Sequence, residues 1–104
     1  MKTYAVKILT LAETDAVEAA LWYDAQSAGL GAEFMAEVNI AAQKLATNPE
    51  IHRLRFKDVR RAPVFRFKFY GLYYLIHGGE VWIMAVHHGR RHPHWLQRRR
   101  RQIG

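Results

Sequence analysis

The sequence predicts an α+β fold in which an N-terminal helical hairpin packs on a mostly antiparallel sheet, in the order β-α-α-β-β-β(-β). Three observations predict this class: an apolar stripe with helical spacing in the first half, period-two alternation after Pro49, and a Gly-Gly hairpin signal near the end. With 104 residues, half of them hydrophobic, the chain is long enough to bury one core. We therefore expect a single domain over residues 1–104, with residues 90–104 as a basic tail.

The first elements are a strand and a helix. Residues 4–9 form a short β-rich run. Thr10 precedes Glu13 by three positions, which is the capping-box spacing that begins a helix. We expect this helix to run to about Ser27 and to end at Gly29 or Gly31.

The second helix has the strongest periodic signal in the chain. Phe34, Val38, Ala41 and Leu45 fall at i, i+4, i+7 and i+11, which places them on one apolar stripe. Asn48-Pro49 ends this helix. Both helices are rich in alanine, so we expect them to approach closely as a hairpin.

The strands that follow are predicted from alternation. Leu54 and Phe56 alternate with basic residues, and residues 64–69 alternate aromatic with basic or aliphatic side chains, which indicates one buried and one solvated face. Residues 72–77 and 81–88 form two further strands joined at Gly78-Gly79, and the apolar run 81–86 indicates a position inside the sheet. The aromatic series assigned to the core by alternation comprises Phe65, Phe67, Phe69, Tyr73 and Tyr74.

The charge divides into two halves. Residues 1–50 carry three lysines against seven acids, a net charge of −4, and residues 51–104 carry thirteen lysines and arginines against two acids, a net charge of +11. A basic surface of this kind attracts polyanions or an acidic protein partner. The acids lie mainly on helix faces that we expect to point away from the basic half, so paired-carboxylate catalysis is not expected.

Several classes of protein are excluded or disfavoured. The absence of cysteine excludes disulfides and thiolate chemistry. The only serine, Ser27, is not in a Gly-x-Ser-x-Gly turn, and Gly29-Leu30-Gly31 lies between helices rather than after a strand. Apolar runs are too short to cross a bilayer or to serve as a secretory signal. We expect a cytoplasmic protein with no membrane segment and no cofactor.

The basic segment that leaves the last strand, residues 87–98, has three alternative interpretations. It is a polyanion site in which Arg90 and Arg91 act as guanidinium forks, an RNA-cleaving site in which arginine stabilises the phosphorane and histidine moves protons, or a metal site. The metal site, built on His88, His92 and His94, is disfavoured because the spacing fits no zinc framework and no cysteine completes it. The candidate binding residues are Arg60, Arg61, Arg66, His87, Arg90, Arg91 and Trp95.

Structural interpretations stand beside these functional ones. The run Arg98–Arg101 is equally consistent with a solvated charge run. Packing at the edge of the core explains Trp95 better than base stacking does. Helix–sheet packing is the simplest explanation of Trp22 and Tyr23, and His52 and His77 are typical of surface or turn positions.

The order of these motifs over about residues 4–98 resembles the ParE branch of the RelE/ParE toxin superfamily, often labelled plasmid stabilisation proteins. The segments that carry the resemblance are 11–15, 20–23, 29–34, Asn48-Pro49, Val59-Arg60-Arg61, the aromatic stretch 65–74, and Ala85-Val86-His87-His88-Gly89-Arg90-Arg91-His92-Pro93. The resemblance implies a bacterial growth-inhibiting toxin of a type II toxin–antitoxin module with a β-α-α-β-β-β core. It also implies a cognate antitoxin, through which the pair binds operator DNA.

The resemblance leaves two targets open. ParE-like members poison DNA gyrase, whereas RelE-like members cut mRNA in the ribosomal A site. For mRNA cleavage, which would make the protein an enzyme, the candidate catalytic residues are Arg61, Arg66, Arg90, Arg91 and His92, with His94 as a second possible acid or base. No tyrosine follows Tyr74, and the second half has only two lysines, Lys57 and Lys68, so a RelE-like set is incomplete.

We therefore favour gyrase inhibition. A ribosome-dependent mRNA endonuclease, a non-toxic basic module that binds nucleic acid or protein, and an inactive family member remain the alternatives.

Overall fold

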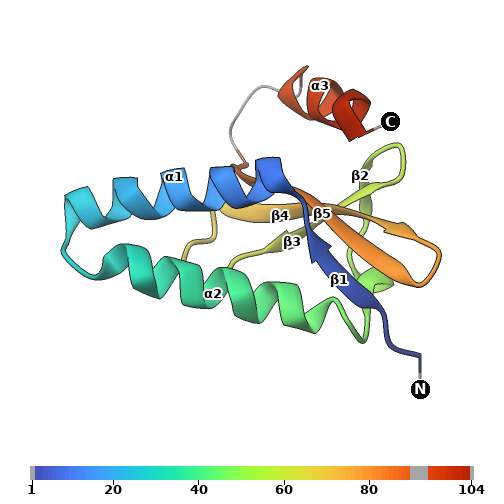
Figure 1. Ribbon diagram of the computed structural model, residues 1–104, viewed down its shortest axis with the longest axis horizontal. Helices are drawn as coiled ribbons and strands as arrows, with labels where there is room; N and C mark the ends of the chain where they lie inside the picture. Colours follow the sequence, from blue (N-terminus) through green and yellow to red (C-terminus); the bar gives the residue numbers. More distant parts are fainter. Residues whose placement is uncertain (1, 90–93, 104) are drawn as a thin grey trace.

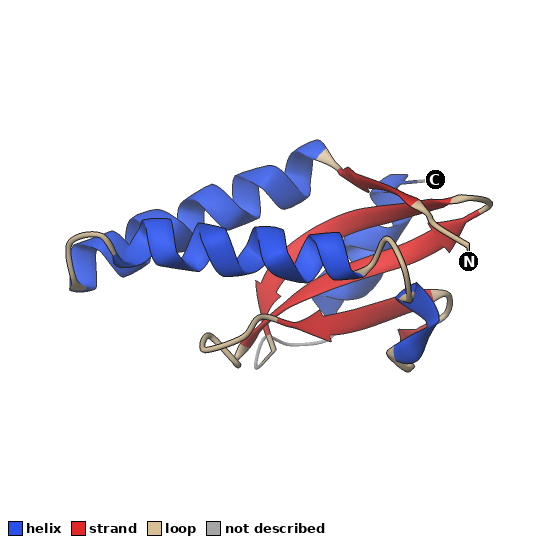
Figure 2. Cartoon of the chain, turned by 90° about the horizontal axis from the view of Figure 1, so that it is seen from below, coloured by secondary structure: helices blue, strands red, loops and turns tan. Residues whose placement is uncertain are grey.

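The computed structural model describes residues 2–89 and 94–103, which form two helices on one face of a five-stranded sheet and a third helix on the other (Figures 1 and 2). The elements are β1 (Ala5–Ile8), α1 (Thr10–Gln26), α2 (Leu30–Lys44), the 3-10 turn η1 (Pro49–Ile51), β2 (Leu54–Phe56), β3 (Val59–Pro63), β4 (Tyr70–His77), β5 (Glu80–His88) and α3 (His94–Ile103). The strand order is β1-β5-β4-β3-β2, with β1 parallel to β5 and the other pairs antiparallel. The predicted α+β class and the order of its elements are confirmed.

The helical hairpin packs through the predicted stripe. Phe34, Val38 and Leu45 of α2 and its C-terminal turn are at most 3% exposed, and alanines of α1 at positions 12, 16 and 19 face them. Gly31 lies where the two helices approach most closely, because a Cβ there would be 2.4 Å from the carbonyl oxygen of Ala20. Gly31 is therefore a packing residue inside α2 rather than the end of α1. The first helix ends at Gln26, and Gly29, with φ +88°, is the N-cap of α2.

The start of α1 differs from the prediction. Leu9 is the N-cap, and its apolar side chain cannot accept a hydrogen bond from the first turn. Thr10 is already the first helical residue. The prediction that Thr10 and Glu13 form a capping box was therefore wrong. Leu9 is held in extended conformation because its N–H donates to the carbonyl of Ile83 on β5, so pairing of β1 fixes where the helix begins.

The β4–β5 hairpin forms as predicted. His77 pairs with Glu80 across Gly78-Gly79, and Gly78 adopts the positive φ of +60° that this turn requires. β5 lies between β1 and β4, which confirms its predicted place inside the sheet.

Residues 64–69 do not form the predicted strand. They make two successive turns, in which the N–H of Phe67 bonds to the carbonyl of Val64 and the N–H of Tyr70 bonds to the carbonyl of Phe67. Each turn advances three residues, so Val64 and Phe67 point inward, while Phe65 is 72% exposed and Phe69 45% exposed. The assignment of Phe65 and Phe69 to the core by alternation was wrong, whereas Phe67, Tyr73 and Tyr74 are buried.

Helix α3 covers the face of the sheet opposite the hairpin. Leu96 of α3, together with Tyr73, Leu75 and Met84 from the two central strands, belongs to a second apolar cluster. The basic tail thus contains an ordered helix that completes the fold. None of the helices described here is long and apolar enough to cross a membrane.

Candidate functional site

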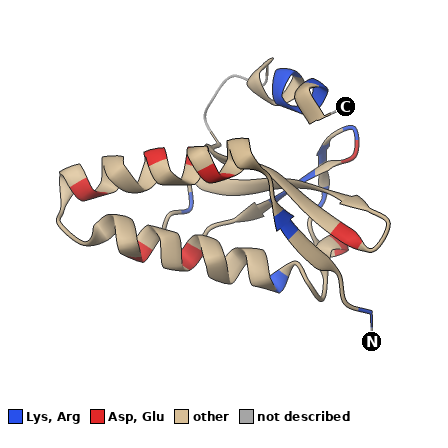
Figure 3. Ribbon diagram, in the orientation of Figure 1, with Lys and Arg blue, Asp and Glu red and all other residues tan. Residues whose placement is uncertain are grey.

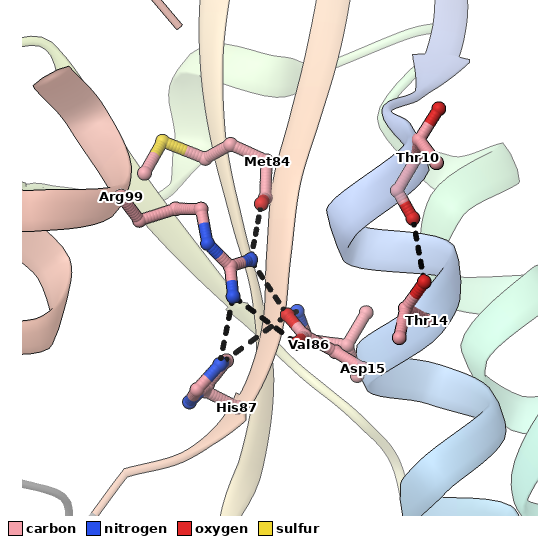
Figure 4. Close-up of polar contacts among 7 residues, drawn as sticks. All are labelled: Thr10, Thr14, Asp15, Met84, Val86, His87 and Arg99. Carbon is pink, nitrogen blue, oxygen red and sulfur yellow. Dashed lines mark hydrogen bonds and ion pairs between the residues drawn. The ribbon is translucent and has the colours of Figure 1, made fainter. Parts of the chain in front are cut away.

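Asp15 lies at the centre of a polar network between α1, β5 and α3 (Figure 4). Its side chain is 12% exposed, and its Oδ2 accepts a hydrogen bond of 3.1 Å from the backbone N–H of Val86. Arg99 donates from Nη1 to Oδ2 at 2.8 Å and from Nη2 to Oδ1 at 3.2 Å. The Nε2 atom of His87 lies 3.3 Å from Oδ2. The expectation that the acids point away from the basic half was therefore wrong for Asp15.

The electrostatics of Asp15 follow from these contacts. Burial alone raises the pKa of a carboxyl group, because it removes water from the charged form. The hydrogen bonds from His87, Arg99 and the Val86 N–H outweigh burial, so the pKa of Asp15 is lower than its ordinary value. The carboxylate is consequently ionised at neutral pH and holds α3 through a charge-assisted pair.

The run Arg98–Arg101 divides into two kinds of side chain. Arg99 is 14% exposed and also donates to the carbonyl of Met84 at 2.8 Å. Arg100 forms a two-bond pair with Asp58 in the turn between β2 and β3, both bonds being 3.0 Å. Arg98 and Arg101 are exposed. The interpretation of this run as solvated charge therefore holds for Arg98 and Arg101. It was wrong for Arg99 and Arg100, which form ion pairs within the fold.

His87 and Trp95 are packed against each other, and His87 also borders an open cleft. Their rings stack at 4.0 Å with an interplanar angle of 8°, and Tyr73 meets Trp95 edge-on at 4.8 Å. Trp95 thus packs at the edge of the core, as predicted. His87 is 8% exposed, and its Nδ1 has no hydrogen-bond partner among the residues that the structure describes.

The structure does not bring Arg60, Arg61 and Arg66 together. Arg60 and Arg61 are successive on β3 and point to opposite faces of the sheet. Arg60 donates to the carbonyls of Glu50 and His52 at 3.3 and 2.6 Å. Thus Arg60 holds the segment around η1 against the sheet.

Arg61 and Arg66 are also bound within the fold. Arg61 donates to the Tyr73 hydroxyl and to the carbonyl of Phe69, both at 3.1 Å. Arg66 lies in a turn with φ +71° and pairs with Glu33 of α2 at 2.9 Å. In the described part of the chain, Arg60, Arg61 and Arg66 therefore do not form one group.

The remaining candidates lie outside the described residues. These are Arg90, Arg91 and His92. Among residues 2–89 and 94–103, no group of three or more histidine, aspartate or glutamate side chains is arranged to hold a metal ion.

An open cleft of about 520 Å³ lies beside the Asp15 network. Its walls include Leu11, Glu18 and Trp22 of α1, with Tyr70 and His88 from the sheet, and the network residues Asp15, His87 and Arg99 also line it. Tyr23 packs against Phe34, Phe67 and Tyr70 as predicted, but Trp22 is 56% exposed, so helix–sheet packing does not explain it. The residues that sequence reasoning missed here are Asp15, Glu18 and Arg99.

Comparison with known proteins agrees with the fold. Residues 6–93 match the family described as ParE toxin of type II toxin-antitoxin system, parDE. No individually curated protein matches the chain at a significant level. A solved structure described as the chromosomal ParDE TA system from P. aeruginosa is similar, with a TM-score of 0.74 over 83% of this chain and 96% of that chain, at 14% sequence identity. The family match covers most of the chain, and the chain therefore belongs to the ParE family, the toxins of type II toxin–antitoxin systems.

Proposed function

We propose that this ParE-family toxin acts in the cytoplasm by inhibiting DNA gyrase, and that a cognate antitoxin neutralises it by binding its basic surface. The observation that carries the choice of gyrase over mRNA is the separation of the candidate arginines. Cleavage of a phosphodiester needs cations and a proton-transfer group around one phosphate. Of the candidate catalytic residues that the structure describes, Arg61 donates to Tyr73 and Phe69 of the sheet region, whereas Arg66 pairs with Glu33 of α2, so the two guanidinium groups are held at different places by acceptors within the fold.

The proposed antitoxin surface consists of the β2–β3 hairpin and α3. Figure 3 shows basic segments on both, and the Arg100–Asp58 pair fixes them beside each other. Its exposed cations are Arg53, Arg55, Lys57, Arg98 and Arg101. β2 is an edge strand, so an extended acidic segment can add to it through backbone hydrogen bonds while its carboxylates meet these cations.

Two assays test the proposed target. Purified toxin is added to gyrase and relaxed plasmid, and supercoiling should be inhibited and then restored by the antitoxin. In parallel, 5′ ends of cellular mRNA are mapped minutes after the toxin is induced without antitoxin. Growth arrest with intact messages supports the proposal.

Two results contradict it. New cuts at codon-phased positions in translated messages would establish the ribosome-dependent nuclease. Absence of growth arrest would favour an inactive family member or a non-toxic binding module.

A further inference from the structure

A shallow cavity of about 140 Å³ lies between α2 and the end of β3, on the side of the molecule from which Figure 2 is viewed. Its lining includes Ile40 of α2, which is 45% exposed, and Phe65 in the turn after β3, which is 72% exposed. Ala62 and Pro63 of β3 also line it. Two large apolar side chains exposed beside one cavity are typical of an interaction surface.

The charged groups that line this cavity balance each other. Glu37 and Lys44 stand on either side of Ile40 at i, i+3 and i+7, so the three side chains form one row on α2. Glu37 and Lys44 are about 10 Å apart along the helix axis, too far to pair with each other. Neither forms an ion pair with any residue that the structure describes. Burial and the nearby Arg60 lower the pKa of His52, the other titratable group in the lining, so it is uncharged at neutral pH.

The row of Glu37, Ile40 and Lys44 is complementary to itself. If α2 packs antiparallel to α2 of a second copy about a two-fold axis beside Ile40, the row of the second copy runs in the opposite order. Glu37 of each copy then meets Lys44 of the other, and the two Ile40 side chains are buried between these ion pairs together with Phe65. A strongly acidic or strongly basic partner would instead meet one like charge for every opposite one.

We propose that the outer side of α2, with Phe65, binds a second copy of this chain and forms a two-fold symmetric homodimer. The interface uses none of the cations assigned to the antitoxin surface and does not depend on the target of toxicity. Each copy has a net charge of +7, so general repulsion opposes association of two copies. Self-association of the purified toxin therefore reports a specific contact.

Sedimentation velocity with the purified full chain, at concentrations up to about 0.1 mM, detects dimers with micromolar dissociation constants. The wild type should shift from monomer to dimer as the concentration rises. Ile40→Ala should weaken the dimer by about tenfold, which corresponds to the loss of one interface anchor. The matched control is Val17→Ala on α1, where Val17 is 52% exposed, and it should change the dissociation constant less than about twofold. Circular dichroism checks that both variants fold.

Charge reversal tests the two-fold arrangement. Glu37→Lys and Lys44→Glu should each weaken the dimer by about tenfold, because each variant places like charges opposite one another in both pairs. An equimolar mixture of the two variants should dimerise as the wild type does, since two positive side chains of one then face two negative side chains of the other. Both variants keep a net positive charge, so general attraction does not explain this recovery. Glu13→Lys on α1 makes the same change of net charge and should leave the dimer within about twofold of the wild type.

Three results would overturn the inference. The first is a wild-type chain that stays monomeric over the whole concentration range. The second is an equal loss of dimer in the α1 controls, and the third is a mixture of the two charge-reversal variants that stays monomeric. Sedimentation needs neither gyrase nor growth arrest, so none of these results bears on the gyrase assay. Conversely, a toxin that fails to inhibit gyrase leaves the dimer in place.

Discussion

Arg99 of α3 forms a two-bond ion pair with Asp15 of α1, although 84 positions separate them in the chain. The same guanidinium group donates to the carbonyl of Met84, and the same carboxylate accepts from the N–H of Val86. One ion pair thus connects both helices to the backbone of β5. The position of α3, and with it the basic surface, depends on this contact.

Replacing Arg99 by alanine should destabilise the protein by about 3 kcal/mol, because it leaves the mostly buried carboxylate of Asp15 without its main partner. Urea unfolding followed by tryptophan fluorescence measures this, and Trp95 should also become more exposed. Arg101→Ala, which removes the same charge from an exposed position of the same helix, should stay within about 0.5 kcal/mol. Equal losses in the two variants would show that the pair does not hold α3.

Stability should fall in acid because the pKa of Asp15 is lower in the folded protein than in the unfolded chain. The ionised form stabilises the fold fully above the unfolded value, about 4, and this contribution is lost as the pH falls through the lower folded value. Hydrogen bonding to Arg100 also lowers the pKa of Asp58, which adds in the same direction.

Asp15→Asn tests this dependence on pH. Thermal unfolding of the wild type between about pH 5 and pH 2 should show a steeper loss than the variant does. Parallel curves for the two proteins would mean that Asp15 does not link protonation to folding.

Gly31→Ala should destabilise the hairpin by about 1–3 kcal/mol, although alanine ordinarily favours a helix by about 1 kcal/mol over glycine. The added Cβ would lie 2.4 Å from the Ala20 carbonyl oxygen and 2.8 Å from the Asp24 carboxyl, so the helices must move apart. Gly79→Ala, where nothing lies within 4 Å, is the control and should change stability little. A Gly31→Ala protein more stable than the wild type in urea would contradict the close approach.

Replacing both Arg90 and Arg91 by alanine should abolish growth inhibition while the protein stays folded, because we propose that these two arginines, which follow the last strand in the sequence, bind carboxylate or phosphate groups as guanidinium forks. Growth after induction measures toxicity, and circular dichroism checks the fold. Lys2→Ala with Lys44→Ala removes the same charge elsewhere and should leave toxicity unchanged. Full toxicity of the arginine variant would place the site elsewhere.

A structural feature could be predicted from the sequence when residues close to it in the chain determine it. The stripe of Phe34, Val38 and Leu45 and the Gly78-Gly79 turn are set by neighbouring residues, and both predictions were confirmed. Residues 64–69 were mispredicted because two turns have a period of three, and aromatic residues at every second position imitate a strand.

The candidate site was harder because its contacts are distant in sequence. Nothing near Asp15 distinguishes it from the other acids of α1, and Arg99 stands in a run of four arginines that is typical of a solvated end. Their pairing appears only when α3 crosses the sheet. The outward position of Trp22 was equally hidden, because a periodic pattern shows a helix without showing which of two apolar faces is buried.

The parallel pairing of β1 with β5 has a consequence for how the toxin matures on the ribosome. The α1–α2 hairpin depends on contacts close in sequence and can form early, but residues 5–8 must wait for residues 80–83 before the sheet closes. Helix α3 follows β5 and docks later still. A nascent chain that has not reached residue 80 therefore lacks both the closed sheet and α3, and it cannot yet present the basic surface that α3 forms with the β2–β3 hairpin.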